Sequence, residues 1–157
     1  MPISDGVFDC IFSSQVWHHI EDKQATADEC NRMLRQAGYT VIRTTSHDQL
    51  NKKIVFEYFP EIKDNQIKVY PSNEDFESYF KKAGFSETRF YEYSLEQYQS
   101  VEELVDIANI KLWSMFRPIS DKGLEKGVEK LWKYYRDTGG SEIQFIRKWC
   151  LLGCFFG

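Results

Sequence analysis

The stretch that decides the fold is FDCIFSSQVWHHIEDKQATADECNRMLRQAGYTVIRT, residues 8–44. Apolar residues run from Val7 to Phe12 with one interruption at Asp9, and a second apolar run covers Tyr39 to Thr44. A short, nearly continuous apolar run is typical of a strand that is buried on both faces of a parallel sheet. We therefore expect two parallel strands joined by a right-handed crossover that contains a helix.

The segment between these two strands has the signals of a helix. Asp22 is placed to cap the first turn, and the helix is expected to run to about Ala37. Four small or apolar residues fall at helical spacing on one face: Cys30, Met33, Leu34 and Ala37. Gly38 follows directly, which predicts that it takes the left-handed conformation that ends many helices.

The rest of the chain continues to alternate helical and extended patterns. A helix carrying Leu50, Ile54 and Tyr58 is expected to close at Pro60. Two capping-box pairs predict helix starts, Ser72 with Asp75 and Ser100 with Glu103. Further expected boundaries are a helix stop at Gly84, a strand over 86–94, a helix end at Pro118, a helix start at Asp121, and a final strand or strand pair over 142–156. The chain is thus expected to be α/β.

Length, charge and cysteine spacing exclude several classes of protein. Its 157 residues suit one domain, and the net charge of -4 argues against a nucleic-acid partner. The four cysteines have no zinc-ligand spacing, so we expect no metal and mostly buried, reduced thiols. No apolar run is long enough to span a bilayer and no leader pattern is present, which predicts a cytoplasmic protein without a membrane span.

The order of motifs resembles the central part of class I S-adenosylmethionine-dependent methyltransferases, in the ubiquinone and menaquinone methyltransferase-like (type 11) group. The matching features are Phe8 with Asp9, the serine pair at 13–14, the "HHI" stretch with Asp22, the helix motif at 29–34 and the "QAGY" turn at 36–39. The segment 71–85, PSNEDFESYFKKAGF, resembles a later helix of that family, and 145–155 resembles its antiparallel seventh strand.

The resemblance implies the C-terminal portion of a Rossmann-like sheet, strands four to seven, with added helices. The whole chain, 1–157, would be a single partial methyltransferase domain, and 94–140 would be a helical insertion or lid. The cofactor would be S-adenosylmethionine and the acceptor a small molecule. The family's glycine-rich loop and ribose-binding acidic residue have no counterpart in the sequence, so the other half of the site would come from another chain or an earlier gene start, or would be lost. The open sheet edge would then also favour self-association.

The resemblance also implies roles for individual residues. Ser13, Ser14 and Gln15 would lie at the end of the fourth strand, where that family approaches the methionine part of the cofactor. His18 would act as the catalytic base. Residues on the substrate side would be Trp17, His19 and His47; the alternative is that Trp17 packs in the core and that His19 is a packed structural residue. An aromatic stripe at helical spacing in this insertion fits a lid or, more simply, a second core; its residues are Trp113, Phe116, Trp132, Tyr134 and Tyr135.

Two other functions fit parts of the sequence. The first is a non-catalytic, methyltransferase-like remnant that acts as a binding or dimerisation module. The second is a dinucleotide oxidoreductase, which shares the fold class but whose glycine fingerprint is not found in this sequence. Binding of S-adenosylmethionine separates these functions from the methyltransferase.

Overall fold

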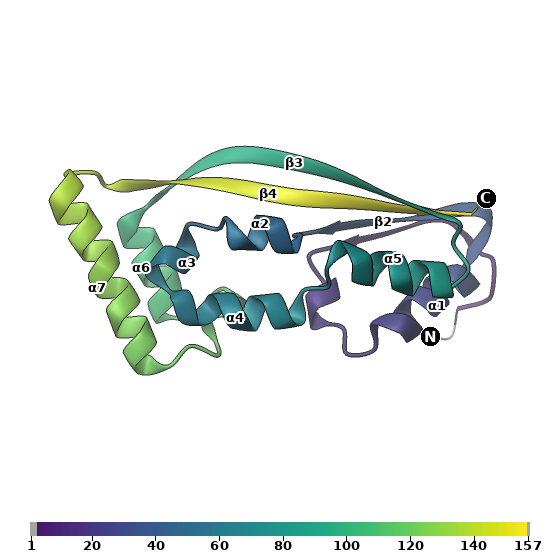
Figure 1. Ribbon diagram of the computed structural model, residues 1–157, viewed down its shortest axis with the longest axis horizontal. Helices are drawn as coiled ribbons and strands as arrows, with labels where there is room; N and C mark the ends of the chain where they lie inside the picture. The colour runs from purple at the N-terminus through teal and green to yellow at the C-terminus, as the bar shows by residue number, and fades with distance from the viewer. Residues whose placement is uncertain (1–2, 157) are drawn as a thin grey trace. The chain divides into compact units, whose positions relative to one another are not determined.

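The computed structural model describes residues 3–156, with the backbone alone for residues 48 and 145–149. The described chain divides into two compact units, each of which is assembled from separate segments. The first unit is drawn from 1–47, 69–93 and 148–157, and the second from 48–68 and 94–147. Two long strands, labelled β3 (Glu87–Ser100) and β4 (Glu142–Phe155) in Figure 1, have residues in both units.

The sheet contains four strands in the order β1-β2-β4-β3. Their bounds are Phe8–Ser14 for β1, Leu34–Thr44 for β2, Glu87–Ser100 for β3 and Glu142–Phe155 for β4. β1 and β2 are parallel, and β4 is antiparallel to β2 with Thr40 opposite Cys154. This order confirms the α/β class, and the pairing of β4 with β2 also confirms the expectation that the last strand is antiparallel.

The crossover from β1 to β2 is the helix α1, Lys23–Met33, which begins where the sequence indicated. The carboxylate of Asp22 accepts a hydrogen bond from the Ala25 backbone amide at 2.9 Å. The helix ends about four residues before the expected position, because the chain is already extended from Leu34 onward. β2 therefore begins earlier than Tyr39, the start that the apolar pattern suggested.

Gly38 does not have the left-handed conformation that the sequence suggested, since the positive φ angle belongs to Ala37 at 66°. The glycine is required for a different reason. A Cβ atom at position 38 would lie 2.9 Å from the Arg35 carbonyl oxygen and 3.2 Å from the Asp9 carbonyl oxygen. Only a residue without a side chain allows the backbone of β2 to approach the backbone of β1 this closely.

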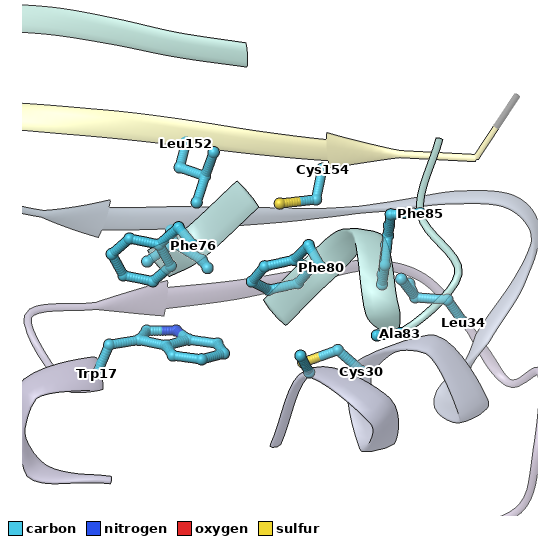
Figure 2. Close-up of a cluster of buried hydrophobic side chains, with 11 residues drawn as sticks. Trp17, Cys30, Leu34, Phe76, Phe80, Ala83, Phe85, Leu152 and Cys154 are labelled. Atoms are coloured by element: carbon cyan, nitrogen blue, oxygen red, sulfur yellow. The ribbon is translucent and has the colours of Figure 1, made fainter. Parts of the chain in front are cut away.

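The core of the first unit lies between one face of the sheet and two helices, α1 and α5 (Asn73–Lys82). Figure 2 shows Leu152 and Cys154 extending from β4 toward the aromatic rings of Phe76 and Phe80 on α5. The capping box expected at the start of α5 is complete: the side chains of Ser72 and Asp75 each accept a hydrogen bond from the other residue's backbone amide. Gly84 then ends the helix with φ at +97°, as the sequence predicted.

The opposite face of β1 differs from expectation. Its residues at alternate positions, Phe8, Cys10 and Phe12, are exposed, so β1 is not buried on both faces. The physical reason is that α1 and α5 pack on one face only, and that β1 is an edge strand, with β2 as its partner among the described residues. Cys10 is therefore an exposed thiol, in contrast to the buried Cys30, Cys150 and Cys154.

The second unit is mainly helical. Its helices comprise most of α2 (His47–Asn51) and nearly all of α4 (Pro60–Val69), together with α3 (Val55–Tyr58), α6 (Val101–Asn109), a short 3-10 turn (Ser114–Phe116) and α7 (Asp121–Thr138). α3 ends at Tyr58, just before Pro60 as expected, and Pro60 also begins α4, where its missing amide would be unpaired in any helix. α6 ends at Asn109, well before Pro118.

Close contacts join α7 to the segment around α3 and α4. Gly127 lies against the ring of Phe59, and no side chain would fit there. The carboxylate of Glu61 accepts hydrogen bonds from the backbone amide and the hydroxyl of Ser120, which is itself the N-cap of α7. Phe116 is buried and packs edge-to-face on Phe59. These contacts give the unit its own core, and they support the core alternative for part of the aromatic stripe.

Four other aromatic residues of the predicted lid, Trp113, Trp132, Tyr134 and Tyr135, are half-buried. Trp113 stacks on Phe116, and Trp132 meets Tyr135 edge-to-face. The boundaries 94–140 do not coincide with the second unit, which also includes 48–68 and extends to 147. In the part of the chain that the structure describes, no helix combines the length and apolar character needed to cross a bilayer.

Candidate functional site

The candidate site is built on the carboxyl ends of β1 and β2, which meet because the two strands are parallel. β1 ends at Ser14, and the chain turns sharply at Gln15, whose φ angle of 53° is in the left-handed region. The Gln15 backbone amide donates a hydrogen bond to the Arg43 carbonyl oxygen of β2 at 2.8 Å. A left-handed glutamine is uncommon, and such positions concentrate at functional sites.

The two serines at the end of β1 point to different neighbours. The Ser13 hydroxyl accepts a hydrogen bond from the indole nitrogen of Trp17 at 2.8 Å. The Ser14 hydroxyl accepts one from the Arg43 guanidinium at 2.8 Å. A serine that accepts a hydrogen bond still has its own O–H to donate. Both side chains are half-buried, so each is held in place at the rim of the sheet.

Trp17 is a core side chain in this structure, with 2% of its surface exposed. Its indole contacts Phe76 and Phe80 of α5, each with ring centroids 5.4 Å apart. The expectation that Trp17 packs in the core is therefore confirmed. A role for Trp17 in lining a substrate site stays a prediction. The buried indole holds the start of the short 3-10 turn Trp17–His19, which carries the histidine pair.

His18 and His19 lie in different environments. His18 is half-buried, and its ring stacks on Tyr70 with centroids 4.1 Å apart and an angle of 11° between the planes. His19 is exposed and contacts His18 with centroids 3.9 Å apart. The sequence suggested that His19 was the packed member of the pair, and this expectation is wrong because Tyr70 packs on His18 instead.

His47 begins α2, three residues after the end of β2, and reaches the same region. Its Nε2 atom lies 2.7 Å from the Tyr70 carbonyl oxygen. A carbonyl oxygen only accepts hydrogen bonds, so this nitrogen of His47 carries a proton. Tyr70 therefore contacts two of the three candidate histidines, His18 through its ring and His47 through its backbone.

Tyr70 was not among the candidate residues that the sequence indicated. Burial raises the pKa of its phenol to about 12, so the phenol is neutral at pH 7. The residue lies 52 positions from His18 along the chain, and no local pattern relates the two. The one available signal was the Tyr-Pro step between two helices, because a residue before proline is confined to an extended backbone.

Three consecutive polar residues, which begin with the last residue of β2, were also missed. Thr44, Thr45 and Ser46 are buried, although threonine and serine are usually exposed. The Thr44 hydroxyl has no hydrogen-bond partner among the residues whose side chains the structure describes. The Thr44 hydroxyl, at the carboxyl end of a parallel strand, is therefore available to a polar ligand.

Metal ligands do not gather here. Across the described residues, no group of three or more histidine, cysteine or acidic side chains is close enough to hold a metal ion. Residues 13–19 and 44–47, with Tyr70, form a polar and aromatic site rim with no cluster of charged groups. Such a rim can hold a polar ligand through hydroxyl and amide groups and can offer an imidazole as a proton acceptor.

One protein family matches the N-terminal segment of the chain, which carries much of the candidate site. The family described as "Methyltransferase domain" matches residues 1–42, which include β1, α1 and most of β2. The matched segment thus contains Ser13, Ser14, Gln15 and His18. A search of curated protein sequences finds no match.

Solved structures extend the likeness to the whole chain. A protein from Anabaena variabilis, described as a methyltransferase from an antibiotic biosynthesis pathway, is 17% identical with a TM-score of 0.69, covering 98% of this chain and 69% of that protein. One from Bacillus halodurans, also described as a methyltransferase, is 15% identical with a TM-score of 0.59, covering 99% of this chain and 67% of that protein. One from Thermotoga maritima, described as a SAM-dependent methyltransferase, is 15% identical with a TM-score of 0.53, covering 100% of this chain and 59% of that protein.

The chain therefore has the fold of class I methyltransferases, and its residues 1–42 match the methyltransferase-domain family. This confirms the Rossmann-like sheet inferred from the sequence and agrees with the resemblance over the first βαβ segment. The ubiquinone-like subgroup and the restriction to the C-terminal portion of the domain stay predictions. The chain spans between about three fifths and two thirds of the three solved proteins.

Proposed function

We propose that this chain contributes the fourth-strand side of an S-adenosylmethionine site and transfers a methyl group to a small molecule. The observation that carries this proposal is the meeting of the β1 and β2 carboxyl ends, with Ser13, Ser14 and Gln15 beside His18. The family match over residues 1–42 includes all four residues. The same match makes a non-catalytic remnant the less favoured function.

The residues at the end of β1 fit a polar cofactor. Ser13 and Ser14 each accept one hydrogen bond from within the chain and keep a hydroxyl proton to donate. The buried Thr44 hydroxyl, which has no partner among the described side chains, lies at the end of the neighbouring strand. When bound, S-adenosylmethionine supplies an activated methyl group on a sulfonium.

His18 supplies the proton acceptor in this proposal. The acceptor molecule's oxygen or nitrogen loses a proton as its bond to the methyl carbon forms, and a ring nitrogen of His18 takes that proton. Imidazole suits this step at neutral pH because its ordinary pKa lies near 6.5. His19 and His47 contribute to the substrate side.

Calorimetry with S-adenosylmethionine tests the cofactor part of the proposal. Saturable binding at micromolar concentration is expected for the wild-type chain, and binding should weaken several-fold in Ser14→Ala and Gln15→Gly. Glycine at position 15 accepts the left-handed backbone, so this variant removes the side chain without strain. The matched control is Ser94→Ala on β3, which should bind normally. The absence of heat at millimolar ligand contradicts the proposal.

Formation of S-adenosylhomocysteine in the presence of a panel of phenols, enols and amines tests the acceptor class. His18→Gln should abolish turnover while keeping cofactor binding, and His19→Gln should keep most of the turnover. Equal activity in wild type and His18→Gln contradicts the base role.

Self-association through the sheet edge stays a prediction, with a second copy of this chain as the partner. It is supported by the exposed apolar side chains of β1, namely Phe8 and Phe12, on a strand whose partner among the described residues is β2 alone. Exposed apolar edge strands readily pair with other strands.

A further inference from the structure

The contact between Tyr70 and His18 is a face-to-face stack. The ring planes are 11° apart, and the Tyr70 hydroxyl oxygen lies 3.4 Å from Nε2 of His18. An imidazole nitrogen donates or accepts hydrogen bonds in the plane of its ring. Because the two planes are nearly parallel, the phenol oxygen lies over the face of the imidazole. The contact is therefore stacking rather than an in-plane hydrogen bond.

We propose that Tyr70 is a positioning residue that fixes the orientation of the His18 ring through this face contact. The stack prevents the imidazole from tilting, and it leaves the in-plane directions of the ring nitrogens to other groups. The inference takes its chemical meaning from the proposed function, in which His18 must face the acceptor molecule. A base contributes only when it is held within hydrogen-bond reach of the proton that it removes.

Tyr70 is itself firmly held, as a positioning residue must be. Only 7% of its surface is exposed, and its carbonyl oxygen accepts the 2.7 Å hydrogen bond from His47. Pro71 follows and confines the backbone of Tyr70 to extended conformations. The capping box of α5 begins at the next residue, Ser72, so the chain is fixed immediately after Tyr70 as well.

The chemistry of the phenol suits positioning better than proton transfer. Burial raises the pKa of Tyr70 to about 12, so the phenol does not compete for a proton at neutral pH. The other ring against His18 belongs to His19, which is exposed and tilted by 46°. Of the two neighbouring rings, Tyr70 is thus the buried one, and it can hold His18 more firmly than an exposed side chain can.

Proton NMR of the His18 ring tests the stack directly in the full chain. A stacked phenol shifts the imidazole carbon-bound protons upfield, and the chain has only three histidines to assign, each by a His→Gln variant. We expect upfield His18 signals in wild type and in Tyr70→Phe, which keeps the ring and loses the hydroxyl. Tyr70→Leu should return them to the positions of an unstacked histidine. Tyr58→Leu makes the same change in the second unit and should leave His18 unaffected.

Labelling with diethyl pyrocarbonate gives an independent readout, with His19 as an internal reference. In wild type and Tyr70→Phe, His18 should react several-fold more slowly than His19, because one face of its ring is covered. In Tyr70→Leu the two rates should approach each other.

Unshifted His18 signals in the wild-type chain overturn the proposal, and so does a Tyr70→Phe variant that behaves like Tyr70→Leu. The wild-type spectrum alone decides the question if Tyr70→Leu does not fold. These measurements use no cofactor, so their failure leaves the proposed methyl transfer standing. Conversely, failed cofactor binding would leave the stack intact.

Discussion

The two faces of the sheet in the first unit are made by the same strands but lie in opposite environments. On the face covered by α1 and α5, Ile42, Leu152 and Cys154 are completely buried. On the other face, Phe12 is 63% exposed and Tyr39 is 40% exposed. Both faces are rich in apolar residues. Apolar composition therefore does not by itself determine burial, and the presence of a covering helix does.

The exposed face has its own internal order. The ring of Tyr39 stacks on Phe155 with centroids 6.0 Å apart, and the Arg89 guanidinium lies 5.2 Å from the centre of the Phe155 ring. These cross-strand contacts follow the register that pairs Tyr39 with Phe155. An apolar sheet face of this kind is characteristic of an interaction surface.

The largest expected difference between the faces comes from removing one phenylalanine beside each: Phe76 of α5, which packs on the covered face, and Phe12 of β1 on the exposed face. Phe76→Ala empties a site that is 1% exposed and should destabilise the chain by about 3–5 kcal/mol. Phe12→Ala removes a ring that is mostly in water and should cost about 0.5 kcal/mol or less. Urea denaturation measures both. Equal losses would mean that the face bearing Phe12 is covered in solution.

Two glycines extend the comparison to the backbone. In Gly38→Ala the new methyl group meets backbone oxygens of Arg35 and Asp9, which cannot move independently, and a loss of about 1–3 kcal/mol is expected. In Gly153→Ala it meets only the ring of Phe155, which can rotate away. Thermal unfolding should therefore show the larger loss for Gly38→Ala. The reverse order would contradict the close approach of β1 and β2.

A buried thiol and an exposed thiol should affect stability differently at alkaline pH. Burial raises the pKa of Cys30 from 9.0 to about 11, so between these values the folded state keeps a proton that the unfolded state has released. Stability must then fall as pH rises through that window, by roughly 2 kcal/mol for this group. Denaturation curves at pH 8 to 11 should show a shallower alkaline decline in Cys30→Ala. Cys10→Ala, at the exposed thiol, should keep the full decline, and identical declines in both variants would contradict the assignment.

The smallest expected effect on folding comes from Phe12→Lys, which places a charge on the exposed face. This variant should keep the thermal stability of wild type and reduce any self-association seen by sedimentation velocity. Tyr98→Lys makes a comparable change at an exposed site in the second unit and should sediment as wild type does. A wild-type chain that is monomeric at high concentration contradicts self-association.

Local patterns predicted much of this fold because their causes are local. The Asp22 cap, the Ser72 capping box and the helix stop at Gly84 each depend on neighbours within a few residues, and each was confirmed. The role of Gly38 was mispredicted because its close contact with Asp9 comes from another strand. Pro60 was predicted only as a helix end. A proline also suits the first position of a helix, and here α4 begins at it.

The site was less predictable than the fold. The strand ends that carry Ser13 and Ser14 follow from the parallel βαβ pattern, and the family resemblance then pointed to His18. The partner Tyr70 lies 52 residues away, and only the folded chain places it against the imidazole. The exposure of β1 could not be inferred from its apolar residues either, because burial requires a covering element and not only an apolar side chain.

The most direct test of the central claim is NMR mapping of S-adenosylhomocysteine on the 15N-labelled chain. The claim is that the cofactor binds at the carboxyl ends of β1 and β2. The account predicts that amide signals of residues 13–19 and 44–47 shift on titration, while those of α7 stay unchanged. Shifts confined to α7 or to the exposed face around Phe12, or no shifts at millimolar ligand, would contradict it.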